Sequence, residues 1–79
     1  MKVRVKLFSV FREHVPGYNP QRGVEAELKD CATVADLLGH LKIPMSNAPV
    51  VTCKGRILKP ADIIKKDSTI EIFQAVAGG

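Results

Sequence analysis

The end of the chain carries the residues best suited to chemistry, a terminal pair of glycines, Gly78 and Gly79. Glycine has no Cβ atom, so such a pair adopts almost any backbone conformation and fits a channel too narrow for other residues. The terminal carboxylate of Gly79 is ionised at neutral pH and becomes an electrophile only after activation. A Gly-Gly end is also typical of inert tails. Because this one follows a strand-like segment, we expect residues 75–79 to be a flexible tail that inserts into another protein's active site.

Other side chains with chemical potential are Cys31, Cys53, His14 and His40. The cysteines show no CxxC spacing, and no histidine is spaced to pair with a cysteine or an aspartate, so we expect neither a metal site nor a catalytic residue in this chain alone. The histidines are interpreted as solvated. Both cysteines are interpreted as small buried hydrophobes, with Cys53 on the inner face of a strand.

Length and composition limit the chain to one small domain over residues 1–79. It has 79 residues, of which 46% are hydrophobic, and it contains no phosphate-binding glycine motif. The first residues contain no continuous apolar run of signal-peptide or membrane length, which favours a soluble cytoplasmic protein without a membrane partner. The net charge of +4 suggests anionic partners. Nucleic acid is not expected, because the chain has 3 Phe, 1 Tyr and no Trp to stack bases.

Basic residues gather in two places. Lys2, Arg4 and Lys6 form either a docking face for an acidic partner or an exposed face neutralised by Glu25 and Glu27. A second group has fewer acidic neighbours in the sequence and comprises Lys54, Arg56, Lys59, Lys65 and Lys66.

Two segments alternate apolar and charged residues, one before and one after a long loop. Val3, Val5 and Leu7 alternate with basic residues, and the segment 24–28 alternates in the same way with mostly acidic ones. The pattern predicts an antiparallel hairpin with the basic face of its first strand beside the acidic face of its second.

The next segment has helical periodicity. Val34, Leu37, Leu38 and Leu41 form an apolar stripe at i, i+3, i+4 and i+7. Thr33 is suited to cap this helix by accepting a hydrogen bond from the amide of Asp36, whose charge the helix dipole favours there. We expect Pro44 to end the helix.

The rest of the chain predicts short strands at Val50–Cys53 and Arg56–Leu58, a helical turn at Pro60–Ile64, and a strand at Ser68–Val76. The pattern Ile70-x-Ile72 is typical of a well-buried strand, so the last strand is predicted to lie centrally beside the first. The helix then packs against one face of a single mixed sheet, an α+β fold.

The segment Ile64–Ile72, followed by the terminal glycine pair, resembles the corresponding part of ubiquitin-like β-grasp proteins. The opening Val5–Glu13 and the ending Val76-Ala77-Gly78-Gly79 resemble the MoaD branch of the MoaD/ThiS family of sulfur carriers, whose MoaD members are small subunits of molybdopterin synthase. The resemblance covers essentially the whole chain in element order and is most specific where both ends occur together. It implies a β-grasp fold, a mixed sheet of about five strands packed on one helix.

The resemblance also implies a role for the tail. In that family an E1-like adenylating enzyme of the MoeB or ThiF type uses ATP and Mg to adenylate the terminal carboxylate, here that of Gly79. A sulfur donor protein then converts it to a thiocarboxylate. Gly78, Ala77 and Val76 would thread into the partner. In the MoaD branch a MoaE-like large subunit binds the pterin acceptor of the sulfur.

Three other functions remain open: a ThiS-like carrier for thiamin thiazole, a carrier for tungsten cofactor, and a protein modifier that forms isopeptide bonds. An interaction module with an inert tail is a further alternative. The chain itself is expected to be non-catalytic and to bind no cofactor.

The expected partner-binding surface is the outer sheet face near the tail. In the strand pattern Phe8 points away from Leu7, and Phe73 points away from Ile70 and Ile72. We therefore expect the two rings to lie side by side on the outer face, next to Ala75. The alternative is that the loop from Arg12 to Gly23 covers one or both rings.

Overall fold

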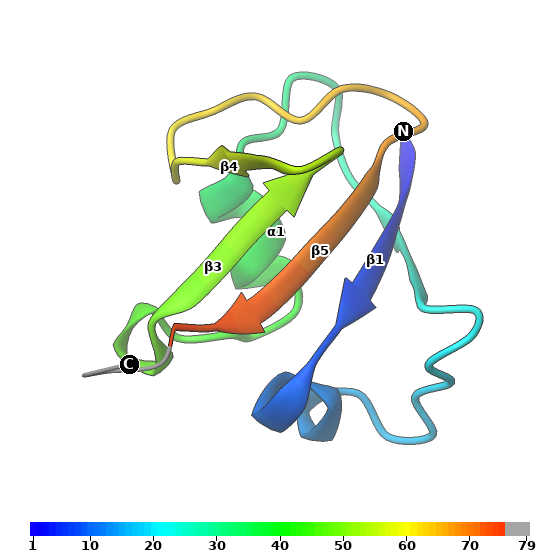
Figure 1. Cartoon of the computed structure of the whole chain (residues 1–79). Helices are drawn as coiled ribbons and strands as arrows, with labels where there is room; N and C mark the ends of the chain where they lie inside the picture. Colours follow the sequence, from blue (N-terminus) through cyan, green and yellow to red (C-terminus); the bar gives the residue numbers. More distant parts are fainter. Residues whose placement is uncertain (76–79) are drawn as a thin grey trace.

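The computed structural model describes residues 1–75, which form a five-stranded mixed sheet, one α-helix and two short 3-10 helices (Figure 1). In chain order the elements are β1 (Lys2–Leu7), η1 (Ser9–His14), β2 (Val24–Glu27), α1 (Val34–His40), η2 (Met45–Asn47), β3 (Pro49–Cys53), β4 (Arg56–Leu58) and β5 (Thr69–Gln74).

The strand order is β2-β1-β5-β3-β4, so the last strand lies at the centre, as the sequence predicts. β5 runs parallel to β1 and antiparallel to β3. β1 and β2 form the predicted antiparallel pair, with Lys2 opposite Glu27 and Arg4 opposite Glu25. The α+β expectation is therefore confirmed, with a mixed sheet on one main helix.

The core lies between α1 and the inner face of the sheet. Val5 and Leu7 of β1 and Ile70 and Ile72 of β5 are fully buried there, because alternate residues of a strand point to one face. The α1 stripe packs against them through Val34, Leu37 and Leu38.

The helix start follows the predicted cap. The Asp36 amide donates to the Thr33 hydroxyl at 3.2 Å, and the Thr33 amide donates to the Asp36 carboxylate at 2.9 Å. The backbone hydrogen bond from Thr33 lowers the pKa of Asp36 because it favours the ionised carboxylate.

The helix end differs from the expectation. α1 stops at His40, well before Pro44, and the chain turns at Lys42, whose φ is 60°. The amide of Ile43 donates to the carbonyl of Leu38 across this turn. The turn therefore ends the helix, and Pro44 follows it.

The predicted helical turn at Pro60–Ile64 is shorter than expected: the amide of Asp62 donates to the carbonyl of Lys59 at 2.9 Å in a single turn, and no helix follows. The segment lies against the start of α1, where the carbonyls of Pro60 and Asp62 accept hydrogen bonds from the amides of Ala35 and Val34. A helix over these residues would need the same carbonyls. β5 is also shorter than expected, beginning at Thr69 and ending at Gln74.

The cysteines differ from each other. Cys53 is half-buried against the core on β3, in line with its interpretation. Cys31 is exposed, which corrects the expectation of burial. It occupies a turn with φ of 67°, and the adjacent Ala32 takes the buried position. Of the histidines, His40 is exposed and His14 is half-buried, with its ring 6.1 Å from that of Phe11.

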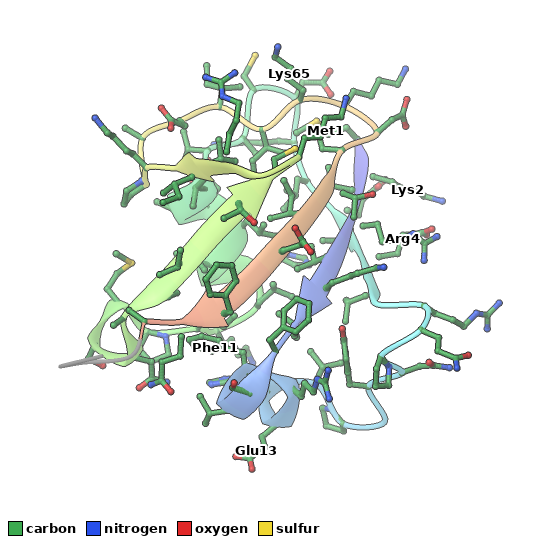
Figure 2. All side chains as sticks on the ribbon, viewed as in Figure 1. Met1, Lys2, Arg4, Phe11, Glu13 and Lys65 are labelled. Carbon is green, nitrogen blue, oxygen red and sulfur yellow. The ribbon has the colours of Figure 1, made fainter. Side chains whose placement is uncertain are left out.

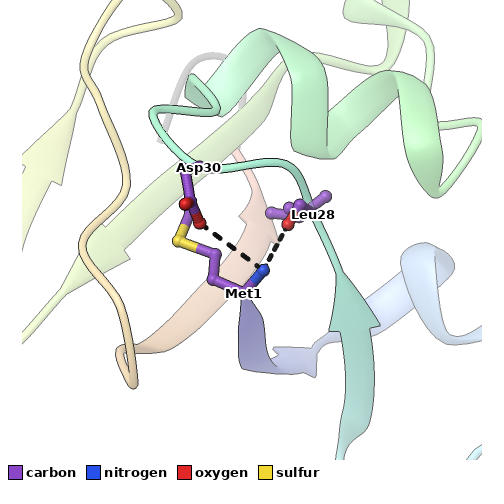
Figure 3. A network of polar contacts seen from close by, with 3 residues as sticks. All are labelled: Met1, Leu28 and Asp30. Carbon is purple, nitrogen blue, oxygen red and sulfur yellow. Dashed lines mark hydrogen bonds and ion pairs between the residues drawn. The ribbon is translucent and has the colours of Figure 1, made fainter.

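The chain start closes the end of the sheet away from the end of β5 (Figure 1). The Met1 ammonium donates to the carbonyl of Leu28 at 2.6 Å and lies 3.8 Å from the Asp30 carboxylate (Figure 3). These contacts hold the segment that leaves β2 beside the beginning of β1.

Candidate functional site

The root of the C-terminal tail is fixed by contacts with η2. The amide of Ala75 donates to the carbonyl of Ala48 at 3.1 Å, and the Gln74 side-chain amide donates to the carbonyl of Asn47 at 3.2 Å. Ala48 has a left-handed φ of 51°, which ends η2 and directs the chain into β3. These two hydrogen bonds therefore fix the direction of the chain after β5 as far as Ala75. Val76, Ala77, Gly78 and Gly79 lie outside the described residues.

Two aromatic rings lie beside this root on the outer face of the sheet. The rings of Phe8 and Phe73 meet edge to face, with centroids 6.5 Å apart and an interplanar angle of 80°. Phe8 directly follows β1, and its amide donates to the carbonyl of Ile72 at 3.0 Å, which continues the β1–β5 pairing. The predicted adjacency of the two rings is confirmed. Val50 of β3 is the cross-strand partner of Phe73, and we call Phe8, Val50 and Phe73 the aromatic face.

The aromatic face remains accessible. Phe73 is 37% exposed and Phe8 is partly exposed. The loop after η1 packs through Tyr18 instead, whose hydroxyl accepts from the amide of Leu7 at 2.8 Å. The alternative, that the segment from Arg12 to Gly23 covers one or both rings, holds in part for Phe8, because Arg12 lies over that ring. It does not hold for Phe73, which stays accessible.

The side chain of Arg12 packs over the ring of Phe8. Its Nε donates to the carbonyl of Leu7 at 3.0 Å, and its guanidinium carbon lies 5.8 Å from the Phe8 ring centre and 5.9 Å from that of Tyr18. Cation–π attraction at these distances stabilises the ring positions. η1 is what places Arg12 here, because the fully buried Phe11 fixes this short helix against the core.

The charged part of the outer face borders the aromatic face. Lys6 and Thr52 are the two register partners of Glu71, and the Thr52 hydroxyl donates to the Glu71 carboxylate at 3.4 Å. Lys2 lies 4.0 Å from Glu25. Lys2 and Arg4 project from β1 toward solvent (Figure 2). The basic residues of β1 are thus partly neutralised, which agrees with the interpretation of an exposed face paired with the acidic residues of β2.

Sequence reasoning brought together Phe8, Phe73 and Ala75 but missed the residues that fix them. Arg12 and Tyr18 have no recognisable spacing, because their contact depends on η1. Asn47 is separated from Gln74 by 27 positions and is found only in the fold.

Two further features bear on the site. Among residues 1–75, no group of three or more His, Cys, Asp or Glu side chains is arranged to hold a metal ion. Within the same residues, no helix combines the length and apolar character needed to cross a membrane.

Solved structures share this fold. SAMP1 from Haloferax volcanii superposes with a TM-score of 0.70 at 20% identity, and the match covers 100% of both chains. A Pyrococcus furiosus protein assigned as molybdopterin converting factor, subunit 1, gives a TM-score of 0.70 at 22% identity, with 95% of this chain and 98% of that chain covered. At these identities the likeness shows the fold. No match to a curated protein sequence was found.

The sheet order, the one α-helix of residues 1–75 and the central position of β5 define a ubiquitin-like β-grasp protein. The ThiS family model matches residues 5–79, and the chain belongs to this family of small ubiquitin-like sulfur carriers. Members of the MoaD-like group are generally not catalytic by themselves and work with an activating enzyme and a larger subunit.

Proposed function

We propose that this protein carries sulfur for molybdenum cofactor biosynthesis as the small subunit of a molybdopterin synthase. The observation that carries the sulfur-carrier part of the proposal is the family match over residues 5–79, which includes the terminal Gly78-Gly79. The fold shared with the Pyrococcus furiosus protein described as molybdopterin converting factor, subunit 1, favours the molybdenum pathway. The rooted β5 and the accessible aromatic face beside it support the proposal, because an activating enzyme must grip the body while it receives the tail.

The proposed chemistry takes place at the Gly79 carboxylate. An E1-like enzyme transfers AMP from Mg·ATP to one carboxylate oxygen, and pyrophosphate leaves. A donor persulfide attacks the acyl carbon, AMP leaves with that oxygen, and a thiol cleaves the resulting S–S bond to give the thiocarboxylate. The thiocarboxylate sulfur is then the nucleophile that a MoaE-like subunit delivers to its pterin. ATP and a reducing thiol pool favour the cytoplasm for these steps.

The body of the protein would contribute docking in this scheme. Exposed aromatic residues contribute strongly to interfaces, and Phe8 and Phe73 form a pre-organised pair because Arg12 and the β1–β5 pairing hold them. A pre-organised surface loses little side-chain freedom on binding.

Mass spectrometry of the intact protein tests the proposal. After incubation with ATP, Mg²⁺, the activating enzyme and a sulfur donor, we expect a species in which one oxygen is replaced by sulfur at the C-terminus. Absence of this species, with an activating enzyme that is competent on another carrier, would overturn it. Rescue of molybdoenzyme activity, compared with rescue of thiamin auxotrophy or of a tungsten enzyme, separates the three cofactor pathways.

A second candidate function is protein modification, in which Gly79 forms an isopeptide bond to lysines of other proteins. The observation that favours it is the shared fold with a protein described as small archaeal modifier protein 1, which superposes with a TM-score of 0.70 at 19% identity over 95% of this chain and 98% of that chain. Immunoblots of cells that express a tagged chain distinguish the two functions. A carrier gives a single band, and a modifier gives conjugates of higher mass that disappear when Gly79 is removed.

A further inference from the structure

A groove of about 510 Å³ lies where β3 ends and β5 begins, beneath the loop that leads from β4 to β5. Cys53 and Ile70 line it and are cross-strand partners that point to the helix side of the sheet. Phe73 points to the opposite side, and the tail root at Ala75 lies at the other end of β5. The groove is therefore separate from the aromatic face in both side and position.

The groove has an apolar floor. Ile64 and Ile70 are buried beneath it, and Leu58 is half-buried beside them. At its margin Ile63 is 60% exposed, although it belongs to a segment whose backbone is held against α1. An exposed aliphatic side chain on a fixed backbone gains stabilisation when an apolar group covers it.

The margin of the groove is basic. Four cationic side chains line it, against two carboxylates: Lys54, Arg56, Lys65 and Lys66, with Asp62 and Asp67. Within residues 1–75 none of these four cations lies in an ion pair. The Asp62 carboxylate is already engaged, because it accepts from the backbone amide of Lys59 at 2.7 Å. Figure 2 shows Lys65 on the loop that crosses this end of the sheet. The groove thus offers positive charge that the described chain does not neutralise.

We propose that this groove binds an extended acidic segment of a partner protein. Aliphatic side chains of the segment cover Leu58 and Ile63, and its carboxylates meet the lysines and the arginine at the margin. β4 is an edge strand that pairs only with β3, so its free edge offers backbone groups to an added strand. A peptide fits better than a nucleic acid, because no aromatic residue lines the groove to stack a base.

The position of the groove gives the interaction a specific use. A segment bound there leaves the aromatic face and the tail root free, because they lie on the other side and at the other end of β5. A partner can therefore hold the protein through the groove while a second protein works on the tail.

The test uses the full chain and a short fluorescein-labelled peptide of repeating Leu-Ser-Glu-Ser, in which Leu and Glu lie two positions apart and so point to the same face of an extended segment. Binding is followed by fluorescence anisotropy, and the contact site is mapped by backbone amide shifts in ¹H–¹⁵N NMR spectra, which also report folding. The groove variants are Lys65→Glu with Lys66→Glu, and Ile63→Ser. Their matched controls are Lys29→Glu with Lys42→Glu, which alter net charge equally away from the groove, and Met45→Ser in η2, an apolar side chain as exposed as Ile63 that does not line the groove.

We expect amide shifts at Cys53, Ile63 and Ile70. The double lysine variant should weaken binding about tenfold, Ile63→Ser should weaken it several-fold, and both controls should bind as the unaltered chain does. Equal weakening in the charge control would overturn the proposal, because it would mean attraction by net charge alone. Amide shifts confined to Phe8 and Phe73 would also overturn it. Tighter binding of single-stranded DNA of equal charge at the same amides would replace the peptide with a nucleic acid.

Discussion

The backbone amide of Ala75 donates a 3.1 Å hydrogen bond to the carbonyl oxygen of Ala48, so the last described residue is held by the turn that ends η2. The neighbouring hydrogen bond from Gln74 to Asn47 makes this a two-point attachment. A tail that starts from a fixed root samples a smaller volume than one that starts from a loose strand end. The attachment should therefore influence how well the tail finds a partner's active site.

The variant Gln74→Ala tests the attachment. Loss of one exposed side-chain hydrogen bond should lower the free energy of unfolding by no more than about 1 kcal/mol. We expect the KM for the activating enzyme to rise several-fold while kcat changes little, because the reacting group is unchanged. Gln21→Ala, an exposed glutamine in the loop before β2, is the matched control. An unchanged KM would mean that the attachment does not position the tail.

The variant Phe73→Ala tests the aromatic face. Truncation of an exposed ring in the centre of an interface costs about 2 kcal/mol of binding, or roughly 30-fold in Kd. We expect this loss for the activating enzyme, measured by titration calorimetry, and a smaller loss for Phe8→Ala. Ile63→Ala removes an exposed aliphatic side chain from the other side of the sheet and should leave this binding unchanged. Equal effects at Phe73 and Ile63 would contradict the assignment of the surface.

Deletion of Gly79 tests the tail. The shortened chain still ends in a carboxylate, but this group stops about 3.5 Å short of its normal reach. We expect complete loss of thiocarboxylate by intact mass, with a free energy of unfolding within about 0.5 kcal/mol of the original. Gly78→Val keeps the length and tests threading separately. If the shortened chain still supported cofactor synthesis in cells, the tail would be inert.

The capping box predicts a pH-dependent part of stability. Because the Thr33 amide lowers the pKa of Asp36 in the folded state, its contribution is present above the unfolded pKa and is lost as pH falls through the folded pKa. Asp36→Asn should lower Tm at neutral pH, and the difference should shrink in acid below 3.8, the ordinary pKa of an aspartate carboxyl. Asp67→Asn replaces an exposed carboxylate that makes no hydrogen bond within residues 1–75 and serves as the control. A Tm difference that stays constant with pH would rule out the charged cap.

Two glycines with nearly equal φ angles give a matched test of packing. Gly23 has φ of 72°, and an added Cβ would lie 2.6 Å from the carbonyl oxygen of Val5. Gly17 has φ of 74° and open space around the same position. Gly17→Ala should cost about 1 kcal/mol of unfolding free energy from its φ alone, and Gly23→Ala about 1–3 kcal/mol more because the β1 backbone must move. Similar losses in urea denaturation would show that contact with Val5 is unimportant.

Local patterns predicted the parts of the fold that local chemistry controls. The alternation in β1 and β5 assigned Val5 and Ile70 to the core and Phe73 to the outer face, because a strand has a period of two. The Thr33 cap was predictable because both partners lie within one turn. The 3-10 helix η1 (Ser9–His14) was not predictable from local sequence, because it depends on the burial of Phe11 in a core that distant segments build. The Gln74–Asn47 contact depends on the same long-range assembly.

The central place of β5 has a mechanical consequence. A partner that pulls on the tail applies force along β5, which is hydrogen-bonded to β1 on one side and β3 on the other. Force along β5 acts on all of its hydrogen bonds to β1 and β3 at the same time, in shear. Force perpendicular to a strand would instead break such hydrogen bonds one after another. Because β1 is parallel to β5 and Met1 is tied to Leu28 at the far end, the pull is shared across the sheet. For the proposed function, in which a partner takes up the tail, this arrangement predicts that the domain stays folded while its C-terminus is pulled.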